Sequence, residues 1–405
     1  MLMKKPIWNT LVQVLGKGVT VGLSLVTTAI LTRRLGVEIY GNYMLITSVW
    51  LLLDSAADFG SKVIGVREAA GESGEKRKEV YIQVAWFRLM ASLVMFFVGL
   101  LIILLWNGFD GIQIEALMGL LMIGFTATAG SLEIIFQTEM KMSLKVWVDI
   151  LFPVIFVAWL LVWKSPINLV LVFGTYLVAR IISLIIGLGL VGKLLGKFRL
   201  VRPDKIFWLK FLKESWPMGV YMILFSGYDR AVDSVLIKQL IGVRDLAYYG
   251  LAYKIYGNLV QPAYYLINSV FPMLSNKQNN RKRLFWQTGV LMFLGAVVVS
   301  GVAYFLSPWI INVLSGNSFG ASVVVLRILL IAMVFAYLGH LVGFTLIALG
   351  KQKQVLWVGI VSLVVNIGGN LLLIPYWGIN GAAWVTVFTE LTAAVLMTGM
   401  LVKRK

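Results

Sequence analysis

Long runs of apolar residues, each about the length of a membrane span, follow one another along this chain of 405 residues. A helix needs roughly 20 mostly apolar residues to cross a bilayer. Apolar residues make up 60% of the sequence and charged residues 13%, whereas about 25% of the residues of a soluble domain are charged. A bilayer interior admits only segments that satisfy their own backbone hydrogen bonds. The sequence therefore predicts an all-α integral membrane protein and excludes a large soluble enzyme.

Breaks in hydropathy divide the chain into twelve predicted transmembrane helices. The longest polar stretch between them, 193–214, is basic and predicts an interfacial linker. Gly36-Val37 recurs as Gly242-Val243, which indicates two six-helix lobes, 1–192 and 215–405, forming a parallel pseudo-repeat around a central cavity. The predicted spans are 9–32, 41–64, 82–106, 113–138, 147–163, 167–192, 215–237, 247–273, 285–307, 325–349, 355–374 and 381–401.

Positive charge gathers in alternate loops. The chain has 36 Lys and Arg against 18 Asp and Glu, a net charge of +18. With the N-terminus in the cytoplasm, most basic residues outside the spans lie in cytoplasmic segments, as the positive-inside rule requires. We therefore expect both termini inside, in the cytoplasmic (inner) membrane. The charge then reflects orientation and contact with anionic membrane lipids, and no nucleic-acid partner is expected.

Several classes of site are excluded by residue counts. The chain has no Cys and a single His, His340, so disulfides, thiolate sites and His-rich metal sites are ruled out. We expect no cofactor, no metal and no catalytic residue. His340, Asn366 and Asn370 are expected to form contacts between helices. The first span is interrupted by Gln13 and Lys17 and lacks an A-x-A site, so it is not expected to be a cleaved signal peptide.

Two predicted spans carry polar residues at gaps of three and four, which places each set on one helix face. A polar stripe along a whole span avoids lipid by lining a wet cavity or by contacting another helix. Because each stripe holds a lysine near the middle of its span, we expect a cavity. The stripes comprise Gln13, Lys17, Thr20, Ser24 and Thr27 in the first span, and Lys254, Asn258, Gln261, Tyr265 and Asn268 in the eighth.

Three cations are expected to bind a substrate inside the membrane. Arg180 lies near the middle of its span, with Tyr176 on the same face, and joins Lys17 and Lys254. A charge at this depth is costly and typical of a functional site. Arg88 lies close to the predicted start of its span, where we expect its side chain to snorkel to the interface.

Three acids inside spans, Asp58, Asp229 and Asp233, are candidates for ion coupling. A carboxylate near the middle of the membrane is costly unless it takes up a proton or pairs with a cation. The alternative is a set of structural ion pairs. Their expected cationic partners are Lys62 for Asp58, at spacing i,i+4, and Arg230 or Lys254 for one of the other two acids.

Three sequence blocks occur in order across nearly the whole chain: LTRRLGVEIYG over 31–41, the segment 233–254, and LIPYWGINGAA over 373–383. Together they resemble the polysaccharide (O-antigen, Wzx-type) flippases of the multidrug/oligosaccharidyl-lipid/polysaccharide exporter superfamily. The resemblance implies a V-shaped, two-lobe helical protein that moves an isoprenoid-diphosphate-linked glycan from the inner to the outer leaflet. Asp233 and Lys254 lie at the two ends of the second block.

The expected function is therefore alternating-access flipping of a lipid-linked oligosaccharide, coupled to ion or proton entry through an acid. The cations would offset desolvation of the diphosphate, and the polar stripes would contact the sugars. Expected partners are this substrate, membrane lipids, and the glycan polymerase and chain-length machinery.

Three alternatives stay open. Cation-coupled drug efflux within the same superfamily would require an anionic site. A major facilitator porter would carry its family's basic loop, which 65–74 does not match. A membrane polysaccharide polymerase or ligase would require longer outer loops.

Overall fold

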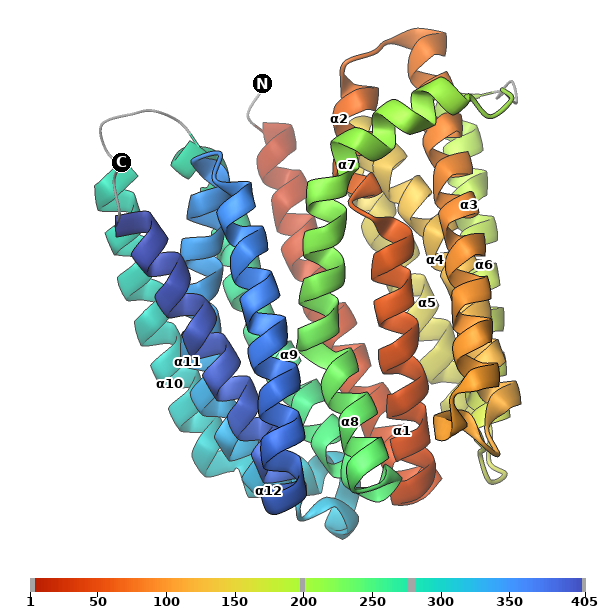
Figure 1. Cartoon of the computed structure of the whole chain (residues 1–405). Helices are drawn as coiled ribbons and strands as arrows, with labels where there is room; N and C mark the ends of the chain where they lie inside the picture. The colour runs from red at the N-terminus through yellow and green to blue at the C-terminus, as the bar shows by residue number, and fades with distance from the viewer. Residues whose placement is uncertain (1–3, 197–200, 276–280, 403–405) are drawn as a thin grey trace. The chain divides into compact units, whose positions relative to one another are not determined.

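The structure is a computed structural model that describes residues 4–196, 201–275 and 281–402. Within these ranges all regular elements are helices (Figure 1). Eight helical segments of this described part are long and apolar enough to cross a membrane. The predicted all-α membrane class is confirmed, and the number of twelve spans stays a prediction.

Packing divides the chain into two compact units. The predicted division into 1–192, 193–214 and 215–405 stays a prediction, and in the structure the first unit extends to Ile223, beyond the predicted end of the linker. Unit 1 comprises Met1–Leu35 and Ile46–Ile223, and unit 2 comprises Gly36–Leu45 and Leu224–Lys405.

Unit 1 is an assembly of long helices joined by short turns. Its first helix, α1, changes direction at Gly36, the first residue of the short part of α1 that belongs to unit 2. The φ of 76° and ψ of 175° at Gly36 lie outside the helical region and suit a residue without a Cβ. The elements are α1 (Lys4–Asp58), α2 (Ser61–Ala70), α3 (Gly74–Leu105), the short η1 (Asn107–Phe109), α4 (Gln113–Thr138), α5 (Met142–Val162), α6 (Leu169–Leu195) and α7 (Lys205–Ser226).

The predicted uninterrupted helix over 41–64 is wrong. Helix α1 ends at Asp58, and Phe59 and Gly60 adopt φ angles of 44° and 74° before α2 begins. A Cβ on Gly60 would lie 2.9 Å from the Cβ of Met218. The break thus lets α7 approach the backbone of this segment closely.

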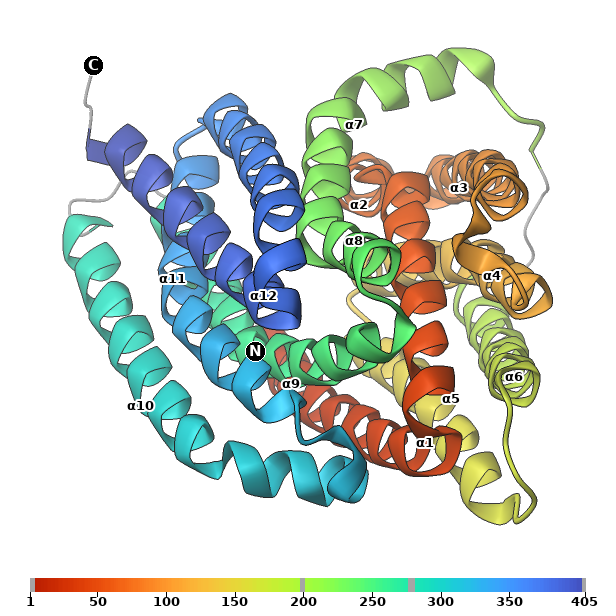
Figure 2. The ribbon, with the colours of Figure 1, turned by 60° about the horizontal axis from the view of Figure 1, so that its bottom comes forward.

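The second half of the predicted linker and the first half of the span after it belong to one helix, α7, which contains Pro217. Figures 1 and 2 show the first part of α7 lying across the direction of the other unit 1 helices before the chain turns to run along them. Gln83 of α3 fixes the start of this helix. Its Nε2 donates to the Arg202 carbonyl (2.7 Å), and its Oε1 accepts from the Asp204 amide (2.9 Å).

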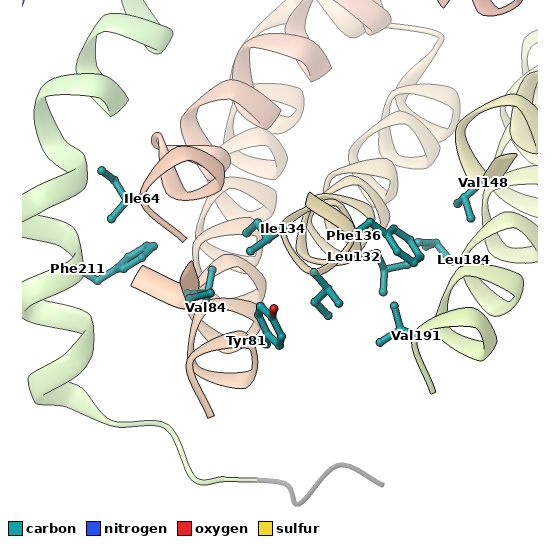
Figure 3. Close-up of a cluster of buried hydrophobic side chains, with 12 residues drawn as sticks. Ile64, Tyr81, Val84, Leu132, Ile134, Phe136, Val148, Leu184, Val191 and Phe211 are labelled. Atoms are coloured by element: carbon teal, nitrogen blue, oxygen red, sulfur yellow. The ribbon is translucent and has the colours of Figure 1, made fainter. Parts of the chain in front are cut away.

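The core of unit 1 forms around α4. Figure 3 shows Leu132, Ile134 and Phe136 of α4 among side chains of the neighbouring helices. Because lipid tails are as apolar as these side chains, close packing between helices, and not removal from water, holds such a core together. The cluster also contains Ile64, Ala69, Tyr81, Val84, Ile135, Val148, Leu184, Val191 and Phe211.

Unit 2 has a π-helical segment near its start and a long helix that folds back on itself. The π-helical segment, η2 (Gly227–Ala231), divides the predicted span 215–237, and such segments are frequent at functional sites. Helix α12 reverses at Gly378, with φ 56° and ψ −140° (Figure 1). The other elements are α8 (Val232–Leu240), α9 (Val243–Ser275), α10 (Arg281–Ser315), η3 (Gly316–Phe319), α11 (Ser322–Ala348) and α12 (Gln352–Val402).

The reversal of α12 requires a glycine where its two arms meet. A Cβ on Gly381 would lie 2.5 Å from the Leu373 carbonyl oxygen, so Gly381→Ala should lower the unfolding free energy by about 1–3 kcal/mol through overpacking. A Cβ on Gly368, in the same helix, would point into open space, with no packing neighbour within 4 Å. Gly368→Ala should therefore leave stability unchanged or raise it slightly. Thermal unfolding of the two purified variants checks this, and equal midpoints would contradict it.

Candidate functional site

A buried carboxyl group lies at the centre of unit 2. Asp233 of α8 is 0% exposed. Its Oδ1 accepts from Nδ2 of Asn366 (3.0 Å) and of Asn370 (2.7 Å). Its Oδ2 accepts from the Tyr249 hydroxyl and lies 3.5 Å from Oγ1 of Thr386. One acid therefore connects α8, α9 and both arms of α12.

The sequence explains how these groups meet. Asn366 and Asn370 are four residues apart and share a face of the first arm of α12, as expected for residues that bond between helices. The reversal at Gly378 brings Thr386 on the second arm to the same acid. The prediction that both asparagines form interhelical hydrogen bonds is confirmed.

Hydrogen-bond donors surround the Asp233 carboxylate, and one amide oxygen of the same group is unused. The Asn370 Oδ1 atom is buried and accepts no hydrogen bond within the described residues. Carboxylate, amide and hydroxyl oxygens are the ligands that hard cations prefer. The carboxylate oxygens of Asp233 and Oδ1 of Asn370 are the atoms here that offer lone pairs to a proton or a small cation. In the described ranges no group of three or more His, Cys, Asp or Glu residues lies close enough to hold a metal ion.

Unit 1 also contains a buried acid, which is held by a cation. Asp58 and Arg88 are 6% and 2% exposed. Arg88 donates from Nη1 to Asp58 and to Ser61 Oγ (2.5 Å), and from Nε to the Ala127 carbonyl (3.0 Å). The predicted partner of Asp58, Lys62, places its Nζ 3.9 Å from Oδ1 of the acid. The ion pair alternative for Asp58 is therefore present, with Arg88 as an additional partner.

The predicted snorkelling of Arg88 is wrong. Helix α3 begins at Gly74, eight residues before the predicted start of its span at 82, so Arg88 lies several turns inside the helix. Gly130 of α4 leaves room for the guanidinium, since a Cβ there would collide with Arg88 Nη2. A buried arginine requires its carboxylate partner.

The polar stripe of the first span lies on α1. Lys17 is exposed and within electrostatic range of Lys145, Asp149 and Glu133. Thr20 and Ser24 are half-buried, and Thr20 Oγ1 donates to the Lys17 carbonyl (2.9 Å). The local bond of Thr20 satisfies its hydroxyl within the helix.

Lys145, which lies close to this stripe, forms salt bridges with two acids. Lys145 Nζ lies 2.5 Å from Asp149 Oδ2 and 3.5 Å from Glu133 Oε1. Lys17 has no such salt bridge within the described residues. The exposed Lys17 is thus the member of this group best placed to meet an incoming anion.

The other predicted site residues lie in both units. Arg180 of α6 is half-buried in unit 1, and Lys254, Asn258 and Gln261 are half-buried on α9 in unit 2. The amide nitrogen of Asn258 is buried and has no hydrogen-bond partner in the described part of the chain. That these residues line one cavity stays a prediction. Two further predicted residues, Gln13 and Asp229, have side chains that lie outside the described residues.

Comparison with known proteins matches this architecture. A family model described as polysaccharide biosynthesis protein matches residues 7–278. The chain is similar to a lipid II flippase, MurJ, in an inward closed conformation, with a TM-score of 0.78 and 14% identity, covering 98% of this chain and 87% of that one. An inward-facing multidrug resistance MATE family transporter of the MOP superfamily gives 0.76 and 16%, covering 94% and 93%. At these identities the likeness is one of fold.

A relative among curated proteins is an uncharacterized membrane protein of Methanocaldococcus jannaschii. It is 25% identical over 233 residues, which cover 53% of this chain and 44% of that protein. The chain thus matches less than half of this relative. The family match confirms the resemblance to polysaccharide flippases that the three sequence blocks indicated.

The Asp58–Arg88 pair should be structural. Asp58→Asn leaves a buried guanidinium without its counter-charge and should lower the unfolding free energy by about 3–5 kcal/mol. Asp149→Asn is the control, because Asp149 has a 38% exposed side chain and its pair with Lys145 should contribute about 0–1 kcal/mol. Membrane abundance and thermal unfolding measure both. Wild-type stability of Asp58→Asn would show that Arg88 does not depend on this acid.

Proposed function

Because the chain belongs to the polysaccharide biosynthesis protein family, we propose that it is a flippase for isoprenoid-diphosphate-linked oligosaccharide. It moves this lipid from the inner to the outer leaflet of the cytoplasmic membrane. The observation that carries the proposal is the family match over 7–278 in a chain whose fold is similar to that of a lipid II flippase.

The proposed mechanism is alternating access in a two-lobe protein of twelve spans with both termini in the cytoplasm. Lys17, Arg180 and Lys254 bind the substrate, and the positive charges of Lys17 and Lys254 offset the loss of water around its diphosphate. The isoprenoid tail stays in the bilayer throughout. Hydroxyl and amide groups of the two stripes contact the sugars; these are Gln13, Thr20, Ser24, Asn258 and Gln261.

Coupling to an ion or proton is proposed to run through Asp233. Its burial makes the charge on its carboxylate costly. Its hydrogen bonds connect α8 to α9 and α12, so a change in its protonation or cation binding affects all three helices. Asp58 is a weaker candidate, since Arg88 already neutralises it. Asp229 lies in the π-helical segment η2, directly before the helix that contains Asp233, and stays a candidate.

The partners of such a flippase would be membrane lipids, a glycan polymerase and chain-length machinery.

A second candidate function is cation-coupled drug efflux, which the likeness to a MATE family transporter favours. A drug cation would require an anionic site, whereas the three mid-span candidates for substrate contact are cations.

Removal of a substrate-binding cation should stop transport without unfolding the protein. Lys17→Ala, Arg180→Ala or Lys254→Ala should abolish glycan export in cells while protein levels stay normal. Lys17→Arg and Lys254→Arg should retain more export, because charge matters most for holding a diphosphate in a wet site. Lys78→Ala is the control, since Lys78 pairs with the exposed Glu75 near the start of α3. Wild-type export from all three alanine variants would contradict the proposal.

Loss of the Asp233 charge should uncouple transport from the driving gradient. Asn is similar in size but cannot ionise, so Asp233→Asn should remove the response of flux to an imposed proton or sodium gradient. Asp245→Asn, at the start of α9, is the control with the same chemical change. Flux into proteoliposomes, measured with and without the gradient, gives the answer. Gradient-dependent flux at the wild-type rate in Asp233→Asn would exclude this acid from coupling.

A further inference from the structure

Three helices of unit 1 bring aromatic and polar side chains together around Tyr176. The ring of Tyr176 lies 5.6 Å from that of Trp50, 4.5 Å from that of Phe152 and 5.2 Å from that of Phe156. The residues come in pairs spaced four apart, so each pair shares one helix face. The pairs are Trp50 and Asp54 on α1, Phe152 and Phe156 on α5, and Tyr176 and Arg180 on α6.

Two hydrogen-bond donors of this cluster are unused. Trp50 is 6% exposed, and its Nε1 is buried and meets no acceptor in the described ranges. Nε of Arg180 is likewise buried and meets no acceptor in the described ranges. The Arg180 guanidinium stacks on Phe152, with Cζ 4.5 Å from the ring centroid. Buried polar groups in native proteins are nearly always hydrogen-bonded. Two unmet donors in one cluster therefore indicate a ligand that supplies acceptor oxygens.

The same cluster also contains an acceptor and retains accessible surface. Asp54 accepts from the Thr126 hydroxyl, and Tyr176 is within electrostatic range of both Asp54 and Arg180. Asp54, Phe152, Tyr176 and Arg180 are each half-buried, so part of each side chain can be reached. Aromatic walls with a few placed polar groups are typical of small-molecule sites.

We propose that this cluster, which consists of Trp50, Asp54, Phe152, Phe156, Tyr176 and Arg180, is a subsite for a sugar ring of the transported lipid. The inference deepens the proposed function and rests on it. Hydroxyl and ring oxygens of a pyranose accept from Trp50 and Arg180, and one of its hydroxyls donates to Asp54. The apolar C–H face of the sugar packs against the aromatic side chains.

The alternative ligand of this cluster is the diphosphate, and the composition of the cluster disfavours it. The carboxylate of Asp54 repels a phosphate but accepts from a sugar hydroxyl. Aromatic faces carry negative charge density, which an anion avoids. Arg180 thus has a different task from Lys17, which is exposed on α1.

The test compares lipids with and without sugar. The full-length protein in lipid nanodiscs is titrated with polyisoprenyl diphosphate and with the same lipid carrying one glucose, galactose, N-acetylglucosamine or glucuronate. Methyl glycosides of the same sugars form a third arm. Trp50→Phe removes the indole N–H and keeps a ring, and Arg180→Lys keeps the charge but removes Nε and the planar stack. Trp159→Phe is the control, because Trp159 is 47% exposed on α5.

Trp50→Phe and Arg180→Lys should each weaken binding of the best glycosylated lipid by about fivefold to tenfold, the effect of losing one hydrogen bond. Binding of the sugar-free lipid should stay unchanged, as should both affinities of Trp159→Phe. Equal losses for both lipids would assign the cluster to the diphosphate and overturn the proposal. Unchanged affinities in both variants would show that water alone satisfies the two donors, which also overturns it.

The third arm separates the subsite from the function on which it rests. When the wild-type protein binds neither lipid but binds a methyl glycoside, and Trp50→Phe weakens that binding, the flippase proposal fails and the sugar site stands. When it binds no lipid and no glycoside, both proposals are contradicted.

Discussion

The hydrocarbon core of a membrane offers no hydrogen-bond partners, and this constraint governs the structure. Backbone groups are satisfied within helices, so the described chain is helical throughout its regular elements. Buried charged side chains are likewise satisfied by hydrogen bonds and ion pairs inside the protein. In unit 1, Arg88 binds Asp58 and a carbonyl of α4, and in unit 2, Asp233 binds side chains from α9 and α12. These polar contacts fix which helices lie together.

The same contacts suit the two acids to different proposed roles. A carboxylate paired with a buried arginine is committed to the fold, since loss of either charge leaves the other without compensation. Asp233 is surrounded by amide and hydroxyl groups that serve a protonated acid, an ionised one or a bound cation. A change at Asp233 therefore reaches α8, α9 and both arms of α12 at once. Such a connection is what a transporter needs to link ion entry to helix movement.

Hydropathy and spacing predicted the membrane class, and the expected span 113–138 coincides with α4. The three sequence blocks indicated the family by their resemblance to its motifs, and two of them contain the glycines at which α1 and α12 change direction, Gly36 and Gly378. Sequence reasoning missed the break at Gly60, since the reason for it is the approach of α7, a segment far away in the chain. It also missed the Arg88 pair, because the true helix extends into polar sequence that hydropathy assigns to a loop. The prediction that residues such as Lys17 and Lys254 line a cavity is based on their charge and their position within a predicted span.

The central claim is that the chain carries a lipid-linked glycan across the bilayer. The most direct measurement reconstitutes the protein in vesicles that contain a fluorescent polyisoprenyl-diphosphate oligosaccharide. A membrane-impermeant glycosidase then reports, over time, how much glycan has reached the outer leaflet. We predict that the protein makes the inner pool accessible far faster than in protein-free vesicles. An inner pool that stays protected at the protein-free rate, in vesicles where the same protein expels a drug cation, would contradict the claim.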